Sequence, residues 1–179
     1  MSVAPTKVTG HAVAMDVAPE LKVPAITTDE RETLLGFLDW KRAVVLHAAR
    51  DLGDDEGRWT PDGRLLPIAG IVNHLTHVER RWIDGRYLQQ ALPAADPDVE
   101  FAPTRPIGDL VTAYLERRVR TNEIVRSAPS LDVPCPGGRQ PIPYLNLRWV
   151  VVHLLEETSQ HAGHADATRE MLDGQRSTT

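Results

Sequence analysis

The stretch RWVVVHLLEETSQHAGHADATRE, residues 148–170, is a long apolar run that carries two adjacent glutamates and three histidines in its middle. Its apolar residues recur every three to four positions, which is the spacing of one face of an α-helix. This spacing predicts a helix over about 144–172, with Gly174 as its C-terminal stop. On a helical wheel, Glu157 and His161 lie one turn apart within or at the margin of the apolar face, whereas His153 and His164 flank it.

Three more helices are predicted before that stretch. Apolar residues at helical spacing mark segments over about 29–51, 68–92 and 110–128, and the Thr-x-x-Glu sequence at 27–30 has the form of a capping box for the first of them. The segments between the helices are rich in proline and glycine, which favours loops. No stretch alternates polar and apolar residues as a strand does. We therefore predict an all-α four-helix bundle whose long connections leave room for a crossover.

Length and composition favour a single domain of this kind. The chain has 179 residues, of which 41% are hydrophobic, and a formal net charge of −5. We divide it into a flexible N-terminal arm (1–27), the four-helix bundle (28–174) and a tail (175–179). The negative charge and scattered arginines argue against a nucleic-acid partner. The absence of a signal peptide and of an apolar membrane span predicts a cytoplasmic protein that needs no membrane.

Glu157 is the polar residue that most needs an explanation. An unpaired carboxylate against leucines costs several kcal/mol or takes up a proton, so it requires a partner, and a cation is the simplest one. The Glu-x-x-x-His pair of Glu157 and His161 can reach one ion from a single helix. A third ligand must come from another helix, and in NHLTHVERRW (73–82) His74 lies nearer the apolar face than His77. The sequence thus predicts a metal site of His74, Glu157 and His161 with an open position for water or substrate.

Several polar and aromatic residues have two interpretations. A histidine beside an apolar face is commonly a core residue bonded to a backbone carbonyl, so the metal site stays a hypothesis here. His77, His153 and His164 are candidates for catalytic groups or for partners that orient the ligands, or they have no such role. Cys135 lies between two prolines and is a possible nucleophile. For the tryptophans at core spacing, packing is the expected role: Trp40, Trp82 and Trp149.

The motif HLTHVERRW, followed by a long gap and then RWVVVHLLEETSQHAGHADATRE, resembles the DinB-like four-helix family over about residues 28–174. More narrowly, it is similar to the mycothiol-dependent branch, which contains S-transferases and maleylpyruvate isomerases. The resemblance implies a divalent metal, usually zinc or nickel, held at His74, Glu157 and His161. Much of the family has histidine at the position of Glu157. The glutamate found here resembles the maleylpyruvate isomerase subtype, which uses His, Glu and His. The common family ending HRGQ is HAGH here, with His164 in place of the glutamine.

The resemblance also implies an activity. Mycothiol or a similar low-molecular-weight thiol would bind at the open metal position and attack a small electrophilic molecule, by S-transfer or isomerisation, in detoxification or specialised biosynthesis. Arg148 and Arg169 are candidates to bind an anionic substrate or the sugar part of the thiol. A homodimer is expected only by analogy. Three alternatives remain open: a hydrolase that uses metal-bound water, a stress-associated bundle without activity that binds metal, and a ferrous site of two histidines and one carboxylate.

Overall fold

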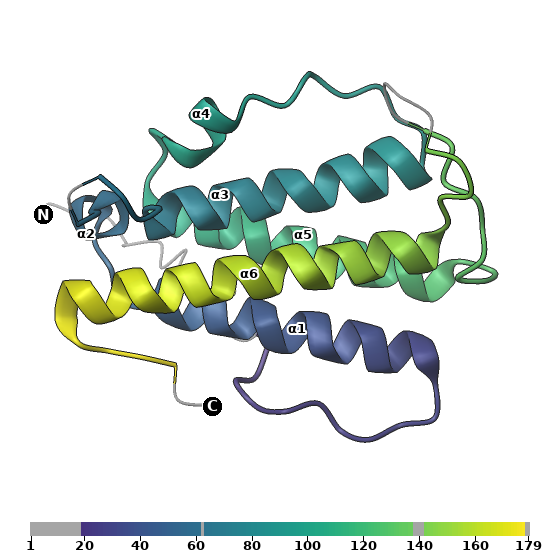
Figure 1. The fold of residues 1–179 in the computed structure, drawn as a ribbon, viewed down its shortest axis with the longest axis horizontal. Helices are drawn as coiled ribbons and strands as arrows, with labels where there is room; N and C mark the ends of the chain where they lie inside the picture. The colour runs from purple at the N-terminus through teal and green to yellow at the C-terminus, as the bar shows by residue number, and fades with distance from the viewer. Residues whose placement is uncertain (1–18, 62, 138–141, 178–179) are drawn as a thin grey trace, which may run out of the picture.

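The computed structural model describes residues 19–61, 63–137 and 142–177, which form a bundle of helices (Figure 1). Its long helical segments are α1 (Glu30–Ala48), α3 (Ile68–Glu79) with its continuation η2 (Arg80–Tyr87), α5 (Ile107–Ser127) and α6 (Leu147–Asp173). The described residues contain no strand, and their only bridge of β type joins Pro134 and Asn146. The predicted all-α four-helix bundle is confirmed. None of the described helices combines the length and apolarity needed to cross a membrane.

The helices do not alternate simply up and down. Ion pairs link Glu30 of α1 with Arg148 of α6 and Glu32 of α1 with Arg126 of α5, so α1 runs parallel to α6 and antiparallel to α5. α3 and α5 are parallel, and the connection between them runs back along α3 (Figure 1). This crossover carries the short helix α4 (Pro97–Phe101) across the outer side of α3.

Helix ends differ in detail from the sequence prediction. The predicted capping box at 27–30 is wrong, because the N-cap of α1 is Asp29 and not Thr27. The carboxylate of Asp29 accepts a hydrogen bond from the Glu32 N–H (3.1 Å). The hydroxyl oxygen of Thr27 instead accepts a hydrogen bond from the N–H of Asp29, before the first residue of α1. Gly174 ends α6 with φ of 78°, as predicted. The predicted loops contain two five-residue helices, α2 (Asp54–Arg58) and α4, which are too short to show a periodic pattern.

The predicted division into arm, bundle and tail remains a prediction. Of the arm, residues 1–18 lie outside the described residues, as do 178 and 179 of the tail. Residues 19–27 form neither helix nor strand.

A buried polar layer separates two apolar clusters in the bundle. One cluster includes Ile68 and Leu110, and the other includes Leu38 and Leu147. Between them lies Arg42, whose side chain is fully buried. Its guanidinium donates to three acceptors, each at 2.8–2.9 Å: Glu79 Oε1, Asp39 Oδ1 and Asn122 Oδ1. Because polar groups are costly inside a bundle unless they are paired, this layer fixes how α1, α3 and α5 align.

Candidate metal centre

The three predicted ligands come together between α3 and α6. His74, Glu157 and His161 each offer one ligand atom, and these atoms all lie within 4.8 Å of one another. Nε2 of His161 is 3.6 Å from Oε2 of Glu157, which is too long for a hydrogen bond. Donors about 2.0–2.2 Å from a tetrahedral zinc ion are separated by roughly 3.3–3.6 Å. The spacing therefore fits a divalent cation after small side-chain movements.

Both histidines are in the form that binds metal. Burial lowers the pKa of His161 to about 4, and the neighbouring His74 and His164 act in the same direction. Burial also lowers the pKa of His74, although Glu100 partly opposes the shift. Neutral imidazoles at pH 7 present a lone pair to a metal. Nδ1 of His161 is buried and has no hydrogen-bond partner within the described part of the chain.

Glu100 is a partner of His74 that the sequence did not predict. Its carboxylate lies 2.8 Å from Nδ1 of His74 and also pairs with Arg81. A carboxylate in this position accepts a hydrogen bond from the Nδ1–H group of His74 and leaves its Nε2 free to bind a metal. Glu100 is 26 residues from His74, in a segment that prolines mark as a loop, so no local spacing connects the two.

Close packing of α4 on α3 places Glu100. Gly70 allows this approach, because a Cβ atom there would overlap the carbonyl oxygen of Phe101. The ring of Phe101 stacks on His74 with centroids 4.3 Å apart. Asn73 donates from Nδ2 to the carbonyl oxygen of Glu100 at 2.8 Å. A small residue in α3 thus sets the orientation of a ligand one turn further along the helix.

Replacing Glu100 with alanine is expected to weaken zinc affinity about 10- to 100-fold, because His74 then loses its orienting acceptor. Glu100→Gln should weaken it less, since the amide oxygen still accepts from Nδ1 although the ion pair with Arg81 is lost. Competition titration with a chromophoric chelator measures both affinities. Asp98→Asn, an exposed change in the same helix, is the matched control. Equal zinc affinity in wild type and Glu100→Ala would contradict the orienting role.

The three candidate catalytic histidines lie in different surroundings. His153 is one turn before Glu157, with its Nε2 3.8 Å from Oε1 of that carboxylate. The ring centroid of His164 is 5.5 Å from that of His161. His77 instead lines a cavity of about 170 Å³ between α3 and the α3–α5 connection, which it shares with Glu100. His153 and His164 therefore adjoin the three predicted ligands His74, Glu157 and His161, which we call the trio. His77 lies in the cavity beside Glu100.

A second group of potential ligands overlaps the first. His153, Glu156 and Glu157 also place one ligand atom each within 4.8 Å of one another. This group belongs to a single helix, and Glu156 is exposed. The first group is more buried and draws on two helices, which favours it as the metal site.

The two candidate arginines bind other parts of the bundle. Arg148, at the start of α6, pairs with Glu30 and Asp132. Arg169 is buried and donates from Nη1 to the carbonyl oxygens of Ala48 (2.9 Å) and Arg50 (2.7 Å). The structure does not bring either guanidinium to the trio. Both contacts hold α6 against its neighbours.

Cys135 is unsuited to the nucleophilic role considered from the sequence. Only 1% of the residue is exposed, and burial raises the pKa of its thiol to about 11. The thiolate is the reactive form, so little of it exists at neutral pH. Any reactive sulfur at the metal site must therefore come from a bound thiol.

The lowered pKa of His161 predicts how stability depends on pH. As pH falls below about 6.5, the unfolded chain binds a proton at this histidine, while the folded metal-free protein does so only near pH 4. Folding stability therefore falls as pH falls through this window, by about 2 kcal/mol between pH 7 and pH 5 from this group. Urea unfolding of the metal-free protein at both pH values measures the loss. In His161→Gln, the loss of stability between pH 7 and pH 5 should be smaller by about 2 kcal/mol. An unchanged loss in this variant would contradict the lowered pKa of His161.

A comparison with protein families places most of the chain in one family. Residues 33–174 match the family model described as mycothiol-S-transferase. The matched range contains His74, Glu100, Glu157 and His161. Among curated proteins, none matches the chain.

Proposed function

Because the chain belongs to the mycothiol S-transferase family, we propose that it is a metal-dependent enzyme that transfers the sulfur of mycothiol to a small electrophilic molecule. The observation that carries the proposal is the convergence of His74, Glu157 and His161 between two helices. Isomerisation by addition and departure of the same thiol is the related activity that these residues also support. The reaction would serve detoxification or specialised biosynthesis in the cytoplasm, where low-molecular-weight thiols stay reduced.

The donor set suits zinc first, and nickel or ferrous iron share the same preference for imidazole and carboxylate. A divalent cation supplies one effect when bound: it lowers the pKa of a thiol beside it, so that the sulfur is present as thiolate at neutral pH. Glu157 contributes one negative charge and the two imidazoles none. The site with its cation carries a net charge of +1, which favours an anionic sulfur.

The protein's own residues orient the ligands and accept the thiol proton. Glu100, held by Arg81, keeps the Nδ1 proton on His74 and directs its Nε2 toward the cation. His153 is the proposed proton acceptor, because it is half-buried and adjoins Glu157. From there the proton can pass to solvent. The sulfur then forms a bond to the electrophilic carbon, and the leaving group departs with its electron pair.

Steady-state turnover tests this function. The zinc-loaded enzyme is mixed with mycothiol and iodoacetamide, and the loss of free thiol is followed against the uncatalysed rate. We expect catalysis in wild type and its loss in Glu157→Ala. No rate above background with any metal would contradict the transferase. Hydrolysis of p-nitrophenyl acetate without thiol, lost in the same variant, would instead favour the hydrolase.

A further inference from the structure

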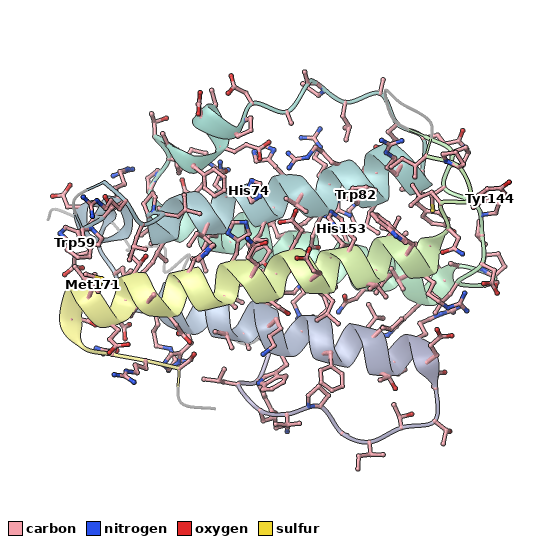
Figure 2. All side chains as sticks on the ribbon, viewed as in Figure 1. Trp59, His74, Trp82, Tyr144, His153 and Met171 are labelled. Carbon is pink, nitrogen blue, oxygen red and sulfur yellow. The ribbon has the colours of Figure 1, made fainter. Side chains whose placement is uncertain are left out.

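Three aromatic rings form a cluster beside Glu157. Trp82 of η2 faces Trp149 and His153 of α6, and the side chains of His74, Trp82 and His153 follow the seam between α3 and α6 (Figure 2). The ring centroids of Trp82 and Trp149 are 5.2 Å apart, and that of Trp82 is 4.5 Å from His153. Trp149 stacks on His153 at 5.1 Å and 20°. Trp82 meets the other two rings at 46° and 65°, so the three rings contact one another as one aromatic cluster, which we call the platform.

Trp82 is half-buried and packs against the apolar cluster that includes Leu38 and Leu147, as expected, whereas Trp149 lies outside the core. Packing was expected for Trp149, and that expectation is wrong, because 46% of the residue is exposed. Trp149, His153, Glu157 and His161 are each four residues apart, so they share one stripe of α6. Nε2 of His153 is 3.8 Å from Oε1 of Glu157, so the platform adjoins this carboxylate. An exposed tryptophan beside a metal site is placed to contact a small molecule.

We propose that Trp82, Trp149 and His153 bind an electron-poor aromatic ring, so that the electrophile taken by this enzyme is a flat aromatic molecule. This inference rests on the proposed function and names its substrate class. Arg86 lies over the ring of Trp82, with its guanidinium carbon 5.6 Å from the centroid, and this contact holds the indole in place. The platform is therefore supported from η2 as well as from α6.

Chemistry connects the platform with the reaction. Indole faces are electron-rich and stack favourably on electron-poor rings. The same electron deficiency makes a ring carbon open to attack by a thiolate. For an aryl halide, the sulfur–carbon bond forms, the carbon–halogen bond breaks, and halide leaves with the electron pair. The thiol proton passes to His153 and solvent, so atoms and charges balance.

Kinetics with two electrophiles test the substrate class. The zinc-loaded enzyme is assayed with mycothiol and either 1-chloro-2,4-dinitrobenzene, which is aromatic, or iodoacetamide, which is not. Trp149→Leu is expected to raise KM for the aromatic electrophile about 3- to 10-fold relative to KM for iodoacetamide. Trp149→Phe should restore most of the preference. Val152→Ala, at another exposed position in α6, is the control that should change neither KM.

A binding measurement without thiol separates this inference from the proposed function. Calorimetry with 1,3-dinitrobenzene, which has no leaving group, should show binding to the wild type that weakens in Trp149→Leu and returns in Trp149→Phe. If neither electrophile turns over, the proposed function fails, and this binding still decides the platform. An unchanged preference together with unchanged binding in Trp149→Leu would overturn the platform. A rise of KM for mycothiol alone would also overturn it, because the rings would then serve the thiol.

Discussion

Replacing His74, Glu157 or His161 with alanine is expected to lower the affinity for zinc by at least about 100-fold. A direct ligand contributes more than the outer partner that orients it, for which losses of about 10- to 100-fold are typical. Elemental mass spectrometry after dialysis against dilute zinc gives the metal content, and we expect near one equivalent in wild type and little in each variant. Circular dichroism confirms that the variants remain folded.

The controls for this experiment distinguish the two overlapping groups of ligands. Glu156→Gln and His153→Ala leave the trio intact and should retain zinc. If these two variants lose zinc while His74→Ala keeps it, the metal belongs to the group on α6 alone, and the trio is not the site. Glu157 is shared by both groups, so the decision depends on the histidines and on Glu156.

Replacing Arg42 with methionine is expected to lower the free energy of unfolding by about 3–5 kcal/mol. Glu79 is 1% exposed, and without Arg42 its charge would be buried and unpaired. A loss of this size is a large part of the 5–15 kcal/mol typical of a folded domain. Although burial acts to lower the pKa of Arg42, the carboxylates around it raise that pKa, so Arg42 stays charged across the accessible range. Urea unfolding followed by circular dichroism measures the change.

A second substitution tests whether pairing causes this loss. Arg42→Met/Glu79→Leu removes both charges and should be more stable than Arg42→Met alone. Lys41→Met, the neighbouring change on the same helix, should lie within about 0.5 kcal/mol of wild type. If Glu79→Leu lowers the free energy of unfolding as much in the Arg42→Met background as in the wild type, the two residues do not act as a pair.

Periodicity in the sequence was enough to predict that the two candidate ligands on α6 lie side by side. Glu157 and His161 interrupt an apolar face, and one turn of helix brings them together wherever that helix lies. His74 followed by the same reasoning on α3, because a third ligand had to come from another helix and His74 lies nearer the apolar face than His77. The four long helical segments were predictable because each carries an apolar stripe over several turns.

The residues that support the site could not be predicted in this way. Glu100 reaches His74 only because the crossover folds back over α3, and its pairing depends on a close approach at Gly70. The seam that exposes Trp149 likewise depends on how η2 packs beside α6. In η2 the Leu88 N–H bonds to the Ile83 carbonyl, five residues back, which shifts the helical register near Trp82. Local spacing carries no signal for such long-range contacts.

The most direct test of the account is a titration of the cobalt(II)-loaded protein with mycothiol, followed by ultraviolet and visible absorption. The account predicts a sulfur-to-cobalt charge-transfer band that saturates at one equivalent of mycothiol and does not appear in Glu157→Ala. Binding of mycothiol without any change in the cobalt spectrum, or no binding at all, would contradict the claim that His74, Glu157 and His161 hold the cation that activates the thiol.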